Sequence, residues 1–336
     1  MPKFLEKIPR IGLLGCGAIA ESYYMPCLAK DPAVLEKLVL VDKDRMRLQK
    51  LASQFRVSNT VGDFHEILGA VDGVILALPT ELHHPVAMEL LSQGIPVLCE
   101  KPLAESGDKA REIVAQARKT GTALSVDYFQ RLIPSFAKVK QLLTDGVLGE
   151  LQNIEYTVGE KFAWPTVSGF YFNSSPSSRG VLRDRGAHVF DHICWWLEGK
   201  PELLSSFNDS FGGSDAQAQV QFKLKSCFGE VRLSWLNQFP CRFFVKGSEA
   251  CVEGEVYDYQ NLTLATPSGS KKHIKLEGTN KLEIGSKIVS NFLAAIRNSE
   301  KPLVEGKDVL NSIQFIDECY QRASRFSMPW YEALGG

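Results

Sequence analysis

The hydrophobic and polar positions of the 336-residue chain follow two different patterns, and the change falls near residue 125. In the first part, short and fully apolar runs alternate with segments long enough for helices. This alternation predicts a parallel sheet covered by helices on both faces. The predicted strands are residues 11–14, 38–41, 74–78 and 97–99. The predicted helices are residues 19–29, 45–55, 85–93 and 107–120, with Gly94 and Gly121 placed to end two of them.

Beyond residue 127, apolar side chains recur at every second position, as in strands with one buried face. Such runs cover residues 152–158, 218–224 and 231–235, and they predict a mostly antiparallel sheet. Helices are expected at residues 134–145, 282–298 and 309–325. The pattern therefore predicts an α/β domain over residues 1–125 and an α+β domain over residues 126–336.

Composition narrows the class of protein. Hydrophobic residues make up 44% and charged residues 23%, values that exclude a disordered or fibrous chain. A net charge of −1 gives no basis for nucleic acid or an anionic membrane as a partner. No apolar run approaches the roughly 20 residues of a membrane span, and residues 1–10 lack the apolar stretch of a secretory signal. The eight cysteines form no CxxC pair, so we expect free thiols in a reducing cytoplasm and no metal.

The first predicted strand leads directly into a glycine turn, Gly15-Cys16-Gly17-Ala18-Ile19-Ala20. Gly15 permits the tight turn, Gly17 lets a pyrophosphate approach the backbone, and Ala20 keeps the helix close to the strand. The first N–H groups of the helix then point at the phosphates. Although a structural turn is the alternative, the order of strand, turn and helix favours dinucleotide binding.

Asp42 follows the second predicted strand, where a carboxylate can accept hydrogen bonds from the ribose hydroxyls of a dinucleotide. A carboxylate also repels a 2′-phosphate, so NAD is favoured over NADP. Lys43, Arg45 and Arg47 follow closely and counter this preference. The alternative is that Asp42 only caps the next helix.

Two further clusters contain groups suited to proton transfer. Glu100-Lys101-Pro102 follows the strand at residues 97–99, at the sheet edge where ligands bind in α/β folds. Lys101 can polarise a carbonyl or hold a hydroxyl, unless it is an ordinary surface lysine.

The second cluster lies on one predicted helical face, where Asp184, His188 and His192 follow one another at intervals of four residues. A histidine titrates near neutral pH and suits proton transfer to an alcohol or carbonyl oxygen. The alternatives are an N-cap role for Asp184, a buried core position for His188, and a metal bound by all three residues.

These segments together resemble the glucose-fructose oxidoreductase, inositol dehydrogenase and rhizopine catabolism superfamily, Gfo/Idh/MocA. The resemblance implies an N-terminal Rossmann domain with a doubly wound parallel sheet, then a C-terminal open, mostly antiparallel sheet with helices on one face. It also implies catalysis at the junction of the two domains, and pairing as a homodimer or homotetramer through the second sheet. The matching residues are Gly15 to Ala20, Ala77-Leu78-Pro79-Thr80 with His84, Glu100-Lys101-Pro102, and Asp184-Arg185-Gly186-Ala187-His188.

By this resemblance, Lys101, Asp184 and His188 match the catalytic residues of the family. His188 is then the general base in oxidation and the general acid in reduction, while Lys101 binds the same substrate oxygen and shares in the proton relay. Asp184 orients His188 or holds a neighbouring hydroxyl. The same resemblance gives cofactor-binding roles to Gly15, Cys16, Gly17, Ala18, Ile19, Asp42, Lys43, Ala77, Pro79, Thr80, His84, Glu100 and Lys101, with a cis bond before Pro102.

The stretch before Asp184 departs from the glycine-rich pattern of many relatives, because Arg179, Arg183 and Arg185 surround the aspartate. Guanidinium groups pair with phosphate or carboxylate, so one interpretation is an anionic substrate. The alternative, which has equal weight, is that these arginines pair with local acids or with another subunit. Lys161 and Trp164 precede this stretch and are candidates, with the arginines, for contacts to a sugar.

Three functions follow from these observations. The first choice is an NAD(H)-dependent oxidoreductase acting on a sugar, cyclitol or sugar derivative. The second is an NADP(H)-dependent reductase of a nucleotide-linked keto sugar, favoured by the arginines. The third is a non-catalytic dinucleotide sensor, against which the presence of Lys101, Asp184 and His188 argues.

Overall fold

The structure is a computed structural model that describes residues 8–163, 180–210 and 214–326. The chain divides into two compact units. Unit 1 contains the described residues up to Phe129 together with Asn280–Leu310. Unit 2 contains Gln130–Thr279 and the described residues from Asn311 onward. The predicted boundary at residue 125 lies near the first division, and the segment 280–310, expected in the second domain, groups with unit 1.

Unit 1 is built on a six-stranded sheet in the order β3-β2-β1-β4-β5-β6, in which every pair of neighbours is parallel. The family expectation of a doubly wound parallel sheet is thereby confirmed. Strands β1 and β4 are buried throughout, as in sheets covered on both faces. The pattern missed β3 and β6, because neither is a continuous apolar run. The strands are β1 (Ile11–Leu14), β2 (Val39–Val41), β3 (Asn59–Val61), β4 (Gly73–Leu76), β5 (Val97–Glu100) and β6 (Leu124–Asp127).

The helices of unit 1 agree with the predicted ones most closely where capping residues are present. Asp44 and Ser106 accept backbone hydrogen bonds as N-caps of α3 and α5, whose bounds match the prediction. Helix α4 begins before the predicted position and contains Pro85, a residue more typical of a first turn. The helices are η1 (Ala20–Tyr24), α1 (Met25–Leu28), α2 (Pro32–Lys37), α3 (Arg45–Phe55), η2 (Phe64–Ile67), α4 (Thr80–Ser92) and α5 (Gly107–Thr120).

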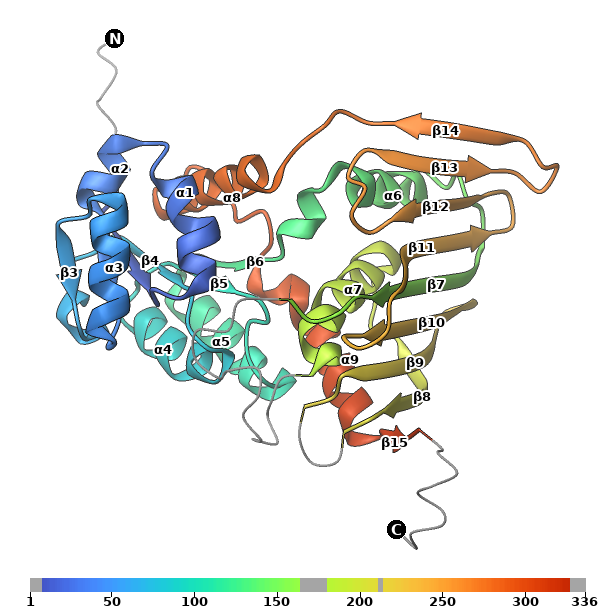
Figure 1. The fold of residues 1–336 in the computed structure, drawn as a ribbon, viewed down its shortest axis with the longest axis horizontal. Coiled ribbons are helices and arrows are strands. Elements are labelled where there is room, and N and C mark those ends of the chain that lie inside the picture. The colour runs from blue at the N-terminus through green and yellow to red at the C-terminus, as the bar shows by residue number, and fades with distance from the viewer. Residues whose placement is uncertain (1–7, 164–179, 211–213, 327–336) are drawn as a thin grey trace, which may run out of the picture. The chain divides into compact units, whose positions relative to one another are not determined.

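The segment 280–310 adds α8 (Lys281–Ile296) and the turn η4 (Gly306–Val309) to unit 1. Asn280 begins α8 by accepting a hydrogen bond from the N–H of Glu283. Helix α8 packs beside α1, and the Cys27 thiol donates a 3.7 Å hydrogen bond to the carbonyl of Leu282. In Figure 1 the parallel strands lie between α1 and α8 on the upper side and α4 and α5 on the lower side. These contacts explain why the segment returns to the first unit.

Unit 2 contains a nine-stranded sheet in the order β14-β13-β12-β11-β7-β10-β9-β8-β15. Its pairs are antiparallel except β7 with β10 and β8 with β15, so the expected mostly antiparallel sheet is confirmed. The predicted alternation is clearest on β7, where Ile154, Tyr156 and Val158 are buried. The strands are β7 (Leu151–Gly159), β8 (Glu202–Asn208), β9 (Gln217–Leu224), β10 (Cys227–Ser234), β11 (Phe239–Gly247), β12 (Cys251–Glu255), β13 (Asn261–Ala265), β14 (Lys271–Lys275) and β15 (Ser324–Arg325).

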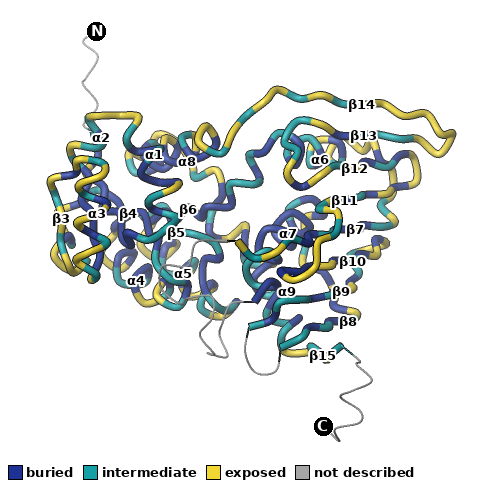
Figure 2. Tube along the Cα trace, in the orientation of Figure 1, coloured by how far each residue is buried: buried dark blue, intermediate teal, exposed yellow. Residues whose placement is uncertain are grey.

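Helices α6 (Pro134–Thr144), α7 (Val181–Leu197) and α9 (Leu310–Gln321) lie on one side of this sheet in Figure 1. The core between helices and sheet is aromatic, and the rings of Phe190 and Phe315 stand edge to face with centroids 5.0 Å apart. Figure 2 shows α7 mostly buried, whereas β13 and β14 at the sheet edge are largely exposed or intermediate. A short turn, η3 (Phe129–Leu132), connects units 1 and 2.

Candidate functional site

The glycine turn after β1 is tightly packed at Gly15 and open at Gly17. Gly15 has φ +97°, and a Cβ there would lie 2.4 Å from the carbonyl oxygen of Ala77. Its N–H donates a 2.8 Å hydrogen bond to the carbonyl of Val41. A Cβ on Gly17, by contrast, would meet no heavy atom of the described residues within 4 Å. The turn is therefore closed toward the sheet and open on its other side.

The helical chain that leaves this turn begins with Ala18 and Ile19 and passes through the π-helical turn η1 into α1. Such π turns occur often at functional sites. Cys16, inside the turn, is buried, and burial together with the charge of Asp42 raises the pKa of its thiol to about 12. The thiol is thus uncharged at neutral pH.

Asp42, at the carboxyl end of β2, is bound to the glycine turn. Its Oδ2 accepts a 2.8 Å hydrogen bond from the backbone N–H of Cys16, and its Oδ1 accepts one of 2.8 Å from Asp44. The alternative helix-cap role is wrong, because Asp44 and not Asp42 caps α3. Arg47 Nη2 lies 3.7 Å from the Asp42 carboxylate, while Lys43 is exposed beside it.

The loop after β4 contains Ala77, Pro79 and Thr80, and Thr80 begins α4 at the same sheet edge. The predicted cofactor contact His84 instead lies on the side of α4 that faces α5, where its Nε2 is 2.7 Å from Glu112 Oε2. The neighbouring His83 is the buried one. Sequence reasoning missed this residue because the pair His83-His84 does not by itself reveal which imidazole points inward.

His83 connects two loops of the sheet edge. Its Nδ1 lies 2.9 Å from the carbonyl oxygen of Pro102, and its Nε2 lies 2.8 Å from that of Leu78. Burial lowers the pKa of the imidazole. The loops that follow β4 and β5 are thus connected through one histidine side chain.

Glu100 ends β5, and the half-buried Lys101 follows it. The bond between Lys101 and Pro102 is cis, as the family resemblance implied. The Glu100 carboxylate accepts hydrogen bonds from the Lys101 N–H and from the hydroxyl of Tyr24. Asp127, at the end of the neighbouring strand β6, also contacts the Tyr24 hydroxyl. Sequence reasoning missed Asp127 because β6 itself was not predicted, and it missed Tyr24 because the helical pattern of residues 19–29 does not single out that residue.

In unit 2, the N-terminus of α7 is held by a residue far away in the sequence. Asp215 Oδ2 accepts a 2.9 Å hydrogen bond from the N–H of Leu182, and its Oδ1 accepts one of 2.7 Å from the Tyr320 hydroxyl. A Cβ on Gly180, the N-cap residue, would lie 1.6 Å from Asp215 Oδ1, so this close approach requires glycine. The N-cap alternative for Asp184 is therefore wrong, since Asp184 lies inside the first turns of the helix.

His188 lies one turn after Asp184 on α7, so the structure confirms the predicted helical spacing. Asp184 is half-buried, and His188 is 7% exposed. His192, one turn later, is fully buried, and its Nδ1 lies within hydrogen-bond distance, 3.1 Å, of the Tyr156 hydroxyl. Burial, with the charge of Arg131 second, lowers the pKa of His192 to about 3. His192 is a neutral core residue, and among the described residues no group of His, Cys, Asp or Glu side chains is placed to hold a metal.

Two of the three arginines near Asp184 have acidic neighbours. Arg183 lies 3.2 Å from Asp317, and Arg185 lies 3.3 Å from Glu160. These ion pairs favour the local-pairing interpretation. Lys161 is exposed in the loop after β7. The remaining predicted substrate contacts, Trp164 and Arg179, lie outside the described residues.

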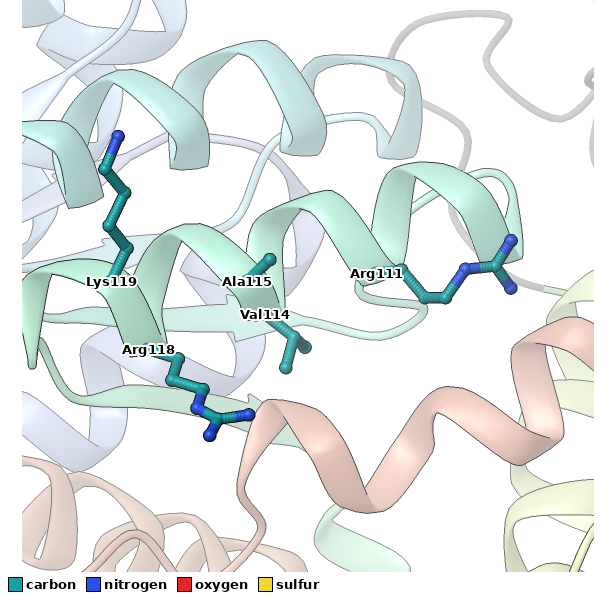
Figure 3. A pocket seen from close by; sticks show the side chains of 5 residues that line it. All are labelled: Arg111, Val114, Ala115, Arg118 and Lys119. Carbon is teal, nitrogen blue, oxygen red and sulfur yellow. The ribbon is translucent and has the colours of Figure 1, made fainter.

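A shallow groove runs along α5, and its walls contain Val114 and Ala115 between the basic residues Arg111, Arg118 and Lys119 (Figure 3). It includes none of the predicted site residues. None of the described helices is both long and apolar enough to cross a bilayer.

Comparison with known proteins agrees with the fold. Residues 9–128 match the family model described as "Oxidoreductase family, NAD-binding Rossmann fold", and residues 136–277 match the "GFO/IDH/MocA C-terminal domain". The chain is similar to a levoglucosan dehydrogenase structure in complex with NADH and levoglucosan, with a TM-score of 0.81 and 17% identity, covering 93% of this chain and 96% of that one.

Among curated relatives, a D-glucoside 3-dehydrogenase of Escherichia coli is 30% identical over 66% of this chain and 61% of its own length. An inositol 2-dehydrogenase of Rhizobium meliloti is 22% identical over 92% of this chain and 94% of its own length. The chain spans only 58% and 61% of the first two curated relatives that it matches. Because the two family models together match most of both units, the chain belongs to the Gfo/Idh/MocA oxidoreductase family with an NAD-binding Rossmann fold.

Proposed function

We propose that the protein is an NAD(H)-dependent oxidoreductase that transfers a hydride between nicotinamide and a carbinol or keto carbon of a sugar, cyclitol or sugar derivative. The observation that supports it most is the arrangement at the carboxyl edge of the parallel sheet. There the open glycine turn, the carboxylate of Asp42 and the Glu100–Lys101 turn all follow strands of one sheet. The glucoside and inositol dehydrogenases among the relatives support the substrate class.

In this proposal the glycine turn, with Gly15, Cys16, Gly17, Ala18 and Ile19, holds the pyrophosphate. Asp42 accepts hydrogen bonds from the adenosine ribose. Ala77, Pro79 and Thr80 line the neighbouring cofactor surface, and Glu100 fixes the turn that presents Lys101. The bound cofactor supplies the hydride acceptor or donor.

The protein's own residues move the proton. In oxidation, an imidazole nitrogen of His188 accepts the proton of the substrate hydroxyl, and in reduction it returns that proton to the carbonyl oxygen. The Lys101 ammonium donates a hydrogen bond to the same oxygen and stabilises the negative charge that develops there. Asp184, one helical turn before His188, orients the imidazole or binds a neighbouring hydroxyl.

The proposal of NAD over NADP rests on Asp42, whose carboxylate repels a 2′-phosphate. Arg47 and Lys43 oppose this preference, but Arg47 also lies near Asp42 and Asp44 and is therefore partly neutralised. A reductase of nucleotide-linked keto sugars receives less support, because Arg183 and Arg185 are close to Asp317 and Glu160. A non-catalytic sensor would not need Lys101, Asp184 and His188 together.

We propose in addition a homodimer or homotetramer in a reducing compartment such as the cytoplasm. The eight free thiols are compatible with such a compartment. Size-exclusion chromatography with light scattering tests the assembly.

The function is tested by titrating the purified protein with NADH and NADPH and then by mixing it with NAD and a panel of aldoses, glucosides and inositols. We expect tighter binding of NADH than of NADPH, and reduction of NAD by at least one polyol. Binding of neither dinucleotide would refute the proposal.

A further inference from the structure

A half-buried carboxyl group, that of Glu100, and a buried one, that of Asp127, lie on either side of one phenol in unit 1. Glu100 and Asp127 are directly opposite each other at the ends of the parallel strands β5 and β6. The hydroxyl of Tyr24, from η1, lies 2.9 Å from Glu100 Oε1 and 2.8 Å from Asp127 Oδ2. Tyr24 is fully buried and Asp127 is 1% exposed. This cluster lies next to Lys101, whose backbone N–H donates a 3.1 Å hydrogen bond to Glu100 Oε2.

The two short contacts require one proton more than two carboxylates and a phenol provide. A phenol has a single proton, which aligns with one of the two acceptors. The other oxygen–oxygen contact then needs a proton from the carboxyl side, because two lone pairs at this distance repel. One carboxyl group is therefore a carboxylic acid that donates to the Tyr24 oxygen, while the other accepts from the Tyr24 hydroxyl.

The surroundings favour this protonation state. Burial, followed by the charge of Asp127, raises the pKa of Tyr24 well above its ordinary value, so the phenol keeps its proton. Burial, followed by the charge of Glu100, raises the pKa of Asp127 to about 8. Burial also raises the pKa of Glu100, and the Lys101 charge opposes the shift. Because the two acids interact strongly, they titrate as a pair.

Several other groups face this cluster. Tyr23 and Cys27 belong to the helical segment that carries Tyr24, and both interact electrostatically with Asp127. Cys99 precedes Glu100 on β5, and its buried thiol is uncharged because burial raises its pKa. Lys281, at the start of α8, lies 5.3 Å from the ring centroid of Tyr23 and 5.7 Å from that of Phe129. The positive charges that face the cluster from these elements are thus Lys101 and Lys281.

We propose that Glu100, Tyr24 and Asp127 form a proton-storing site, which holds one proton at neutral pH and releases it in alkali, changing the charge beside Lys101. The cluster has a charge of −1 when it holds the proton and −2 when it does not. The second charge adds to the negative field that the Lys101 ammonium experiences from Glu100. Asp127 is in this sense a positioning residue, since it acts on Lys101 through Glu100. The stored proton and its action on Lys101 do not depend on the proposed function. Any consequence for catalysis rests on that function, because it requires Lys101 to take part in the reaction.

Infrared titration of the full chain tests the stored proton directly. Wild type should show the C=O stretch of a buried carboxylic acid at pH 7, and the band should disappear above pH 8. In Asp127→Asn and in Glu100→Gln, the difference band should be absent, because an amide N–H takes the place of the acid proton. The control Glu36→Gln removes an exposed carboxylate from the same unit and should leave the band unchanged. Identical spectra at pH 7 for wild type and both cluster variants would overturn the proposal.

The effect of the cluster's charge on Lys101 can be measured separately, without substrate turnover. Competitive labelling of lysine amines, read by mass spectrometry across pH 7 to 10, reports the reactivity of the Lys101 amine. Asp127→Asn cannot acquire the second charge, so its Lys101 should react about three- to tenfold faster than wild type above the cluster's ionisation. Equal Lys101 labelling in both proteins would show that the cluster does not act on Lys101. Because neither readout uses a substrate, failure of this inference is distinguishable from failure of the proposed function.

Discussion

The backbone N–H of Cys16 donates a 2.8 Å hydrogen bond to Oδ2 of Asp42, which joins the glycine turn after β1 to the carboxyl end of β2. One carboxylate thus fixes the turn for the pyrophosphate and is the proposed ribose acceptor. The fold and the proposed cofactor preference are connected through this single side chain.

Asp42→Asn should weaken NAD binding by about tenfold, since a charged acceptor is lost and only one side-chain oxygen remains. NADP binding should improve relative to NAD, because the repulsion of a 2′-phosphate is gone and Arg47 loses its neighbouring negative charge. Fluorescence titration with the two reduced cofactors measures both affinities. The control Asp31→Asn keeps a good N-cap on α2 and should bind both cofactors within about twofold of wild type. An unchanged ratio of affinities in Asp42→Asn would argue against the assigned role.

Much of unit 1 was predictable because its elements follow local rules. A short apolar run defines β1, and capping residues define α3 and α5. The strands β3 and β6 were not predictable in this way, because their side chains are mixed and their pairing depends on neighbours distant in sequence. The grouping of the segment 280–310 with unit 1 was not predictable for the same reason: an amphipathic helix does not reveal the surface against which it packs.

The positions of Gly15, Asp42 and Lys101 at strand ends were predictable, because each directly follows an apolar run or its last residue. Residues that act through tertiary contacts were not predictable from the sequence. Asp215 caps α7 from outside the helix, and His83 rather than His84 joins the loops after β4 and β5. No spacing in the sequence indicates either contact.

Asp215→Ala should destabilise unit 2 by about 2 kcal/mol, because the buried N–H of Leu182 and the Tyr320 hydroxyl lose their acceptor. Urea unfolding measures this change. The variant should also lower turnover, since the first turns of α7 position Asp184 and His188. If Asp215→Asn, which retains one acceptor and presents an amide to Tyr320, were as unstable as the alanine variant, the capping explanation would be incorrect.

Arg131 and Asp191 form a buried ion pair in unit 2, with nitrogen–oxygen distances of 2.8 and 2.7 Å. Arg131→Met should cost about 3–5 kcal/mol, because it leaves the Asp191 carboxylate buried without its cation. Adding Asp191→Asn should restore part of that loss. As a control, Arg322→Ala removes an exposed ion pair with Glu318 and should cost less than about 1 kcal/mol. Additive losses in the double variant would contradict this account.

His192 should make stability fall in acid. Its folded pKa of about 3 lies below the ordinary value of 6.5, so the unfolded chain takes up a proton first as the pH falls. Its contribution is present above pH 6.5 and is lost toward pH 3, with a loss of about 2 kcal/mol between pH 7 and pH 5. Comparing the unfolding free energy at these two pH values in wild type and His192→Gln checks this. His192→Gln should be less stable than wild type at pH 7, but its unfolding free energy should fall less between pH 7 and pH 5. An equal fall in both proteins would show that His192 is not the group responsible.

The central claim is that Lys101 and His188 serve hydride transfer to or from a nicotinamide cofactor. Its most direct test is single-turnover reduction of NAD by the polyol that the panel identifies, in wild type, Lys101→Ala and His188→Ala. Each substitution should slow hydride transfer by about 10²–10⁴-fold, the usual contribution of a proton-transfer group, while NADH binds within about threefold of wild type. Transfer at the wild-type rate in His188→Ala, with cofactor binding intact, would contradict the account.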